Sequence, residues 1–173
     1  MLRTIRAMIA LSMLLAAAMT AAQAGPQGLP MPSGPVVLTV TGQIATRNTD
    51  DAAVFDLAML ESMGAETIRT STIWTTGVQE FTGVPLHRLL ERLGVTEGRL
   101  IARAINDYAA ELPITDAVPG AAMIAFHRNG SPMSVREKGP LWIVYPYDAQ
   151  ESYRSETHFA RSVWQLEQID VRP

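Results

Sequence analysis

The chain contains no cysteine in its 173 residues, and this limits both how it can be held together and what chemistry it can perform. Disulfides, zinc–cysteine sites, iron–sulfur clusters and thiolate nucleophiles are all excluded. The length predicts one domain, and a hydrophobic fraction of 47% is ample for one core. The formal charge of −3 provides no overall positive field, so we expect no nucleic-acid partner. Stability must therefore come from the packing of a single core.

Residues 1–24 have the pattern of a secretory signal peptide. Arg3 and Arg6 give a basic start, residues 7–19 form an apolar run, and Ala22-Gln23-Ala24 is a signal-peptidase site. The apolar run is short for a membrane span, which disfavours the alternative of an uncleaved N-terminal anchor. We therefore expect cleavage after Ala24 and an acidic mature protein outside the cytoplasm.

A glycine- and proline-rich tether, residues 25–35, is followed by a single domain, residues 36–173, without internal repeats. Helices are predicted over residues 50–63, where apolar residues recur at helical spacing, and over 84–93, where leucines form one stripe. Asn129-Gly130 predicts a type I′ hairpin turn. Strands are predicted for six β-branched or apolar runs: residues 36–41, 67–74, 100–105, 121–126, 141–145 and 169–171.

Many short strands with two short helices predict a mixed α+β domain. The strands do not alternate regularly with helices, and no glycine-rich dinucleotide or phosphate-binding loop is present, so a doubly wound nucleotide fold is disfavoured. His87, His127 and His158 do not lie at metal-ligand spacing, which favours solvated or structural roles. The absence of a Gly-x-Ser-x-Gly elbow gives no support for a serine hydrolase.

Aromatic residues next to polar groups, at predicted strand ends, form the richest chemical signal. Trp74, Tyr108, Tyr147 and Trp164 each neighbour hydroxyl, amide, carboxylate or guanidinium groups. A flat polar heterocycle requires this combination, because aromatic faces stack on it while polar groups pair with its edge. The alternative is that these aromatic residues simply fill the core. The residues alone leave both interpretations open.

Several short runs occur in an order that is similar to a known family. The runs, in order, are F-T-G-V-P-L-H-R-L-L (81–90), N-D-Y (106–108), R-N-G (128–130), G-P-L-W-I-V-Y-P (139–146) and W-Q-L-E-Q-I (164–169). Together they resemble the sulfite-oxidase-type molybdopterin-binding domain, an oxidoreductase family. The similarity extends from about Val36 to Val171. It implies the SUOX fold, the mixed β fold with short helices of the sulfite oxidase middle domain.

The sequence departs from that family where the enzymes bind their metal. Their molybdenum is ligated by a cysteine in the segment that matches residues 67–74, and here Thr70, Ser71 or Thr72 stands in its place. A hydroxyl is a harder and far less acidic ligand than a thiolate, so molybdenum is not expected. The arginine of the family's P-L-R run is Trp142 here, and the lysine before the last tryptophan has no counterpart, although Arg161 is near.

The export signal favours one branch of the family. The molybdenum cofactor is inserted in the cytoplasm, and this signal lacks the twin arginines that folded export requires. The chain resembles the small periplasmic pterin-binding proteins that lack the cysteine and bind reduced pterins. Those proteins report to a membrane-bound cyclic-di-GMP enzyme or another sensor, such as a sensor kinase. The resemblance thus implies a periplasmic, non-catalytic pterin-binding protein whose partner is the periplasmic domain of such a protein.

The implied ligand site contains four groups of residues. The aromatic walls are Trp74, Tyr108, Tyr147 and Trp164. The donor edge of the pterin would face Asp107 or Asp148, completed by Asn106 and Gln165. Four cations would hold ligand oxygens or a phosphate: Arg69, Arg136, Lys138 and Arg161. The hydroxyls of Thr70 and Ser71 would line the former metal position.

Two alternatives remain. The first is an oxidoreductase carrying molybdopterin in a cysteine-independent form. The second is an interaction module that has lost its pocket.

Overall fold

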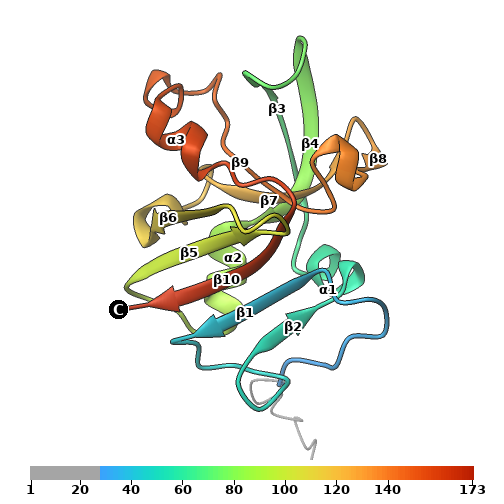
Figure 1. Ribbon diagram of the computed structural model, residues 1–173, viewed down its shortest axis with the longest axis vertical. Helices are drawn as coiled ribbons and strands as arrows, with labels where there is room; N and C mark the ends of the chain where they lie inside the picture. Colours follow the sequence, from blue (N-terminus) through green and yellow to red (C-terminus); the bar gives the residue numbers. More distant parts are fainter. Residues whose placement is uncertain (1–27) are drawn as a thin grey trace, which may run out of the picture.

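A computed structural model describes residues 28–173, which form one mixed and one antiparallel sheet with short helices (Figure 1). The signal-peptide prediction for residues 1–24 lies outside the described residues. The first sheet has the spatial order β2 (Ala53–Phe55), β1 (Leu38–Gly42), β10 (Leu166–Arg172), β5 (Arg99–Ala104) and β6 (Ala109–Pro113). Only β1 and β10 pair in parallel. The predicted α+β class is confirmed.

The second sheet is antiparallel. Its order is β3 (Glu66–Ser71), β4 (Val78–Pro85), β7 (Met123–Arg128) and β8 (Ser131–Pro132), and β9 (Trp142–Val144) also pairs with β7. The β7–β8 turn contains Asn129 and Gly130 at φ angles of 52° and 77°, which confirms the predicted turn. Strands β4 and β6 were not predicted, and β3 ends at Ser71, so that residues 72–77 form the tip of a β3–β4 hairpin.

The leucine-striped helix is confirmed as α2 (Leu86–Leu93), although residues 84–85 belong to the end of β4. Leu86, Leu89 and Leu93 are fully buried and Leu90 is 2% exposed, as their spacing predicts. The helix ends at Gly94, whose φ of 70° is the left-handed conformation that glycine adopts without a Cβ clash. Figure 1 shows α2 behind the first sheet.

The helix predicted over residues 50–63 is wrong in its first half. Residues 53–55 form β2, and the helix is α1 (Leu57–Ser62), because Asp56 rather than the Asp50–Asp51 pair caps it. The Asp56 carboxylate accepts the Met59 N–H at 2.8 Å and also the N–H groups of Ser33 and Gly34 at 2.7 and 2.8 Å. These bonds hold residues 28–35, the described part of the expected tether, against the domain.

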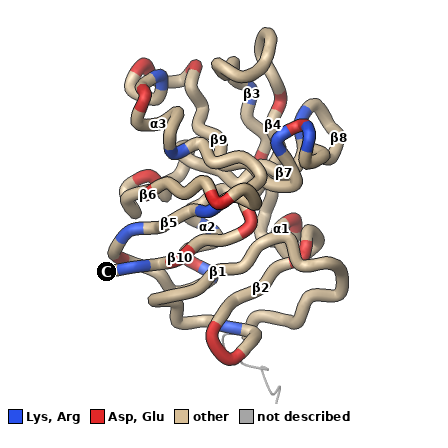
Figure 2. The backbone as a smooth tube through the Cα atoms, viewed as in Figure 1, with Lys and Arg blue, Asp and Glu red and all other residues tan. Residues whose placement is uncertain are grey.

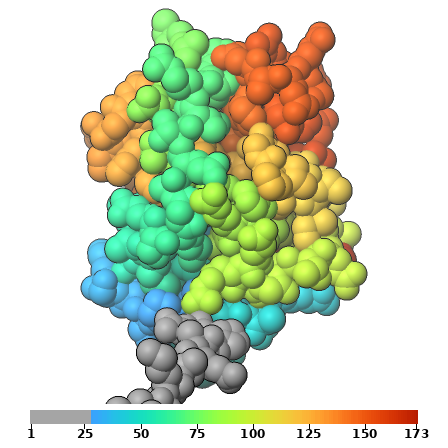
Figure 3. Space-filling model, turned by 180° about the vertical axis from the view of Figure 1, so that it is seen from behind, coloured from blue at the N-terminus to red at the C-terminus, as the bar shows by residue number. Residues whose placement is uncertain are grey.

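The end of the molecule opposite β2 is built from the β3–β4 hairpin and from α3 (Glu156–Arg161), with β9 between them (Figure 1). Seen from behind, the hairpin and the α3 segment adjoin at this end (Figure 3). Single-turn 3₁₀ helices complete the structure: η1 (Ile114–Asp116), η2 (Val135–Glu137) and η3 (Glu151–Tyr153). No helix within residues 28–173 has the length and apolar character needed to cross a membrane.

Candidate functional site

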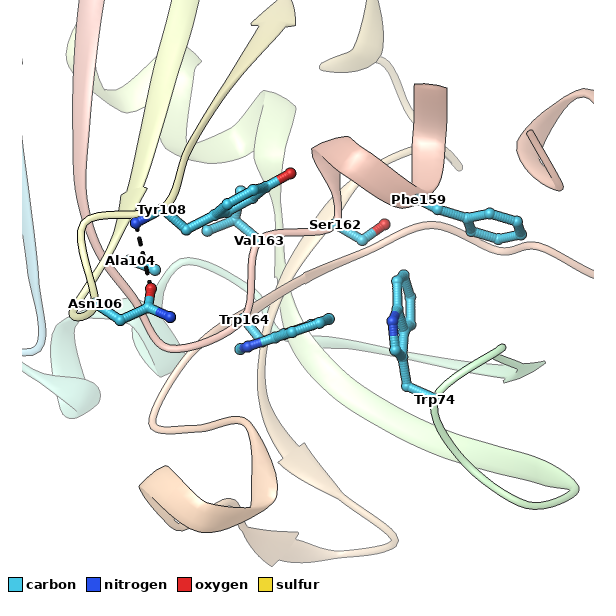
Figure 4. A pocket seen from close by; sticks show the side chains of 8 residues that line it. All are labelled: Trp74, Ala104, Asn106, Tyr108, Phe159, Ser162, Val163 and Trp164. Atoms are coloured by element: carbon cyan, nitrogen blue, oxygen red, sulfur yellow. Dashed lines mark hydrogen bonds between the residues drawn. The ribbon is translucent and has the colours of Figure 1, made fainter. Parts of the chain in front are cut away.

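A pocket of about 240 Å³ lies between α3, the β5–β6 loop and the tip of the β3–β4 hairpin (Figure 4). In the close view, Asn106 and Tyr108 are at one end, Trp74 and Phe159 are at the other, and Trp164 lies between them. Half of its lining residues are aromatic, and none within the described part of the chain is charged. The lining residues are Trp74, Ala104, Asn106, Tyr108, Phe159, Ser162, Val163 and Trp164.

Trp74 forms the wall contributed by the hairpin tip. Its indole meets the rings of Trp142, Phe159 and Trp164 at centroid distances of 5.7, 5.7 and 5.4 Å, with interplanar angles of 65°, 83° and 77°. All of these contacts are edge-to-face, the arrangement that aromatic quadrupoles favour. No ring in the described chain stacks flat on Trp74 or Trp164, and both side chains line the pocket, so a flat ligand in the pocket would meet their rings.

Trp164 follows α3 and is fixed by main-chain bonds on both sides. It forms a bridge with Trp142 of β9, and the next residue, Gln165, adopts a φ of 52° and donates its N–H to the Lys138 carbonyl at 2.9 Å. The ammonium nitrogen of Lys138 lies 4.0 Å from the Trp164 ring centroid, which is a cation–π contact.

Polar groups at the other end come from the β5–β6 loop. The Tyr108 hydroxyl donates to the Ala160 carbonyl at 2.9 Å, so the loop is joined to α3. The side-chain oxygen of Asn106 accepts the Tyr108 N–H at 3.3 Å, while its amide nitrogen has no hydrogen-bond partner within residues 28–173. Ser162 accepts from the Tyr147 hydroxyl at 2.5 Å and donates to the His158 carbonyl at 2.6 Å. Asn106 therefore has a donor free for a ligand.

Asp148 ties the end of β3 to the loop after β9. Its carboxylate accepts the Ser71 N–H at 2.6 Å, the Ser71 hydroxyl at 2.7 Å and Arg154 at 2.9 Å, and its own N–H donates to Thr70 Oγ1 at 3.1 Å. The Ser71 hydrogen bonds and the Arg154 charge lower the pKa of Asp148. These bonds hold the strand from which the Trp74 turn projects. Asp148 thus positions the hairpin and does not line the pocket.

Four of the predicted ligand residues line the pocket: Trp74, Asn106, Tyr108 and Trp164. Thr70, Ser71 and Asp148 form the attachment just described, and Lys138 lies against Trp164. Tyr147 is buried, with its hydroxyl on Ser162. The remaining five do not line the pocket: Arg69 lies near Glu80, Arg161 pairs with Asp116, Gln165 donates to the Val135 carbonyl, and Asp107 and Arg136 are exposed.

Phe159, Ser162 and the small residues Ala104 and Val163 were missed as pocket residues, largely because α3 was not predicted. One signal for this helix was present. Ser155 caps α3 by accepting the His158 N–H at 3.4 Å, and Ser155-Glu156 before an amphipathic turn is a typical helix start. The same hydroxyl lies 2.8 Å from His158 Nδ1, so this histidine has a structural contact.

Residues 56–152 match the family model described as the oxidoreductase molybdopterin binding domain. The match covers more than half of the chain, which therefore belongs to this family. The predicted sulfite-oxidase-like fold is confirmed, since a mostly β structure with few short helices accompanies the match. No curated protein matches the chain. The matched segment contains Trp74, Asn106 and Tyr108, whereas Phe159 and Trp164 lie beyond it.

The family implies a molybdopterin ligand, and the pocket fits the pterin part of that group. At about 240 Å³ it lies below the ~300–1,000 Å³ that drug-sized ligands occupy, which suits a bicyclic ring. Its uncharged aromatic lining and the free Asn106 donor match a flat, neutral heterocycle with a polar edge.

The hydroxyls at the expected metal-ligand position do not fit a metal. Thr70 Oγ1 accepts from Asp148 and donates to the Ser71 carbonyl, Ser71 Oγ donates to Asp148, and Thr72 Oγ1 is 2.8 Å from Thr75 Oγ1. Each oxygen is thus already used by the fold. Within residues 28–173, no three histidine, cysteine, aspartate or glutamate side chains gather as a potential metal site.

Proposed function

We propose that this protein is a periplasmic, non-catalytic pterin-binding protein that reports its ligand to a membrane-bound signalling protein. The observation that carries the proposal is the uncharged pocket in which Trp74 and Trp164 meet other rings only edge to face. Such a pocket offers aromatic faces to a flat heterocycle and holds no buried charge that the ligand would have to neutralise.

The bound ring would lie on the Trp164 face, with Tyr108 on the other side and the Trp74 ring at its end (Figure 4). The amide of Asn106 would bond the polar edge of the pterin, where ring nitrogens and exocyclic groups alternate as acceptors and donors. Backbone groups of the β5–β6 loop stand beside it. The sequence analysis expected Asp107 or Asp148 on this edge. Asp148 is bonded to Ser71, and Asp107 is exposed and does not line the pocket, so the proposal assigns the edge to the amide of Asn106.

Binding rather than catalysis is supported by the chemistry of the chain. No thiolate exists anywhere in the sequence, and the hydroxyls that replace the family's ligand form hydrogen bonds within the fold. We therefore assign the pocket to ligand recognition and derive no oxygen-transfer step from it.

A reporting role is supported by the position of Trp74. Ile73, beside it on the hairpin tip, and Val78, at the start of β4, are 63% and 56% exposed, so the hairpin that would contact the ligand also presents apolar side chains to solvent. A ligand that orders Trp74 would order this surface as well. The expected partner is the periplasmic domain of a membrane cyclic-di-GMP enzyme or of a sensor kinase, and the signal-peptide pattern supports this expectation.

The binding step is tested by calorimetry and thermal unfolding of residues 25–173 with reduced and oxidised pterins. A pterin that binds the folded protein should raise its free energy of unfolding by about 2.7 kcal/mol when the free pterin concentration is a hundredfold above Kd. No heat and no shift with any pterin would contradict the proposal. Stoichiometric molybdenum or tungsten in protein purified from its native periplasm, together with dye-coupled turnover, would favour the oxidoreductase alternative instead.

The reporting step is tested in cells that lack the gene. Complementation with the natural chain should restore the cyclic-di-GMP level or kinase output, whereas Trp164→Ala should leave it as in the deletion. If both chains complement equally although the variant cannot bind pterin, signalling does not depend on the pocket, and the proposed reporting role is overturned.

A further inference from the structure

Lys138 is a cation whose side chain is partnered only by aromatic rings in the described part of the chain. Its ammonium nitrogen lies 4.0 Å from the Trp164 ring centroid and 5.8 Å from that of Trp142. Partial burial and the nearby Arg128 charge both lower the pKa of Lys138. The neighbouring Glu137 bonds Ser134 and lies 3.7 Å from Arg128 instead. Acidic and basic residues are interspersed here, around β8 and η2 (Figure 2).

The backbone holds Lys138 in this position. Its φ of 78° ends η2, and its carbonyl accepts the Gln165 N–H at 2.9 Å, directly beside Trp164. Lys138 does not line the pocket, whereas Trp164 does. The cation therefore contacts the indole without contacting the space that the ligand would occupy, and its influence on the ligand must pass through the ring.

We propose that Lys138 determines the electronic specificity of the pocket by polarising Trp164, so that an uncharged, electron-rich heterocycle binds better than an electron-poor or cationic one. A cation over one face draws π-electron density toward itself, and the opposite face becomes a better partner for an electron-rich ring. Among pterins this favours the dihydro form, whose ring is electron-rich, over the fully oxidised aromatic form. The inference rests on the proposed function and adds the residue that sets the ligand preference, since a reduced pterin is already implied by the family resemblance.

The test uses two uncharged probes with the same side chain, 6-hydroxymethyl-7,8-dihydropterin and 6-hydroxymethylpterin, and measures both Kd values by calorimetry. Lys138→Met keeps an unbranched side chain over the ring and removes the charge, whereas Lys138→Arg keeps the charge. We expect Lys138→Met to reduce the preference for the dihydro probe by about threefold, the size of a partly exposed cation–π contact. Lys138→Arg should retain the preference.

The ratio of the two Kd values separates this role from a structural one, because a loosened pocket weakens both probes equally. Arg99→Met, which removes one positive charge from β5 away from the three tryptophans, is the matched control and should leave the ratio unchanged. Equal weakening of both probes by Lys138→Met, or the same loss of preference in Arg99→Met, would overturn the inference while leaving the pterin pocket intact. Failure of both probes to bind the natural chain would instead contradict the proposed function.

Discussion

The two ends of the domain are packed with different kinds of side chain. The core around the first sheet and α2 is mostly aliphatic: the leucines of α2 are buried in one cluster with Leu38, Leu100 and Val171 of the strands. At the hairpin and α3 end it is aromatic, and Trp74, Trp142 and Trp164 meet there edge to face. The pocket lies at the aromatic end, where it is lined by Trp74, Tyr108, Phe159 and Trp164. We therefore expect the aliphatic end to contribute mainly to stability and the aromatic end to the proposed ligand recognition.

On the aliphatic side, the largest loss of stability is expected for Leu89→Ala. Leu89 is fully buried, so its truncation should cost about 2–5 kcal/mol of unfolding free energy in urea titrations. The pterin affinity of the folded protein should not change, because Leu89 lies on α2 and the pocket is at the other end. Leu89→Met, which conserves volume, is the control and should cost less than about 1.5 kcal/mol. A parallel loss of ligand affinity in the alanine variant would show that the two ends are not independent.

On the aromatic side, Trp164→Ala should have the converse effect. Loss of the stacking face should weaken pterin binding by about tenfold to a hundredfold, as alanine substitution does for stacked nucleobases. The expected loss of stability is smaller than for Leu89→Ala, because Trp164 is only half-buried. Fluorescence is a convenient readout, since all three tryptophans of the chain lie at or next to this pocket. Trp164→Phe should retain most of the affinity, and unchanged affinity in the alanine variant would mean that the pocket is elsewhere.

The aliphatic end was the more predictable from sequence, because its signals are local. The leucine spacing of α2 specifies the helix within a few residues. The Asn129-Gly130 turn of the second sheet is an equally local signal, and it too was predicted. The first half of the helix predicted over residues 50–63 failed, because Asp56 accepts the Met59 N–H and starts α1 there. Strand β6, A-A-E-L-P, lacks β-branched residues, and its pairing with β5 decides its conformation.

The aromatic end was predicted by residue type but not by arrangement. Trp74, Tyr108 and Trp164 were expected as walls and do line the pocket, whereas Tyr147 is buried and reaches only the lining residue Ser162 through its hydroxyl. The role of Asp148 depends on Ser71, a residue 77 positions away in the sequence. Only the pairing of distant segments decides whether such a carboxylate faces a ligand or a neighbouring strand. The hydroxyls at the expected metal-ligand position, Thr70 and Ser71, are a similar case, because their partner Asp148 is also distant in the sequence.

Asp148→Asn tests the connection between the end of β3 and the loop after β9. The pKa of Asp148 is lowered by the Ser71 hydrogen bonds and by Arg154, so its ionised form is favoured in the folded state. Its stabilising effect is therefore present above the unfolded pKa of about 3.9 and is lost as the pH falls through the lower folded value. The natural chain should have the higher Tm at pH 7, and the difference should shrink below about pH 4.

Calorimetric scans from pH 7 to pH 3 measure this difference. The variant should also bind pterin a few-fold more weakly at pH 7, because the turn that carries Trp74 is held less firmly. Asp50→Asn, which removes a carboxylate from an exposed position near β2, is the matched control and should show neither effect. A Tm difference for Asp148→Asn that stays constant across the range would show that its charge is not what holds β3.

The smallest expected effect is that of Ser155→Ala at the start of α3. The serine hydroxyl accepts the His158 N–H and lies 2.8 Å from the ring nitrogen of that histidine, so its loss should cost about 1 kcal/mol, typical of a helix cap. Since α3 carries Phe159 and leads directly to Ser162 and Trp164, the cost should appear in pterin affinity as well as in Tm. Ser155→Asp, which restores a capping oxygen, should recover both. Recovery of Tm without recovery of affinity would indicate that α3 stabilises the aromatic end without shaping the pocket, and would place the recognition surface on the hairpin and the β5–β6 loop alone.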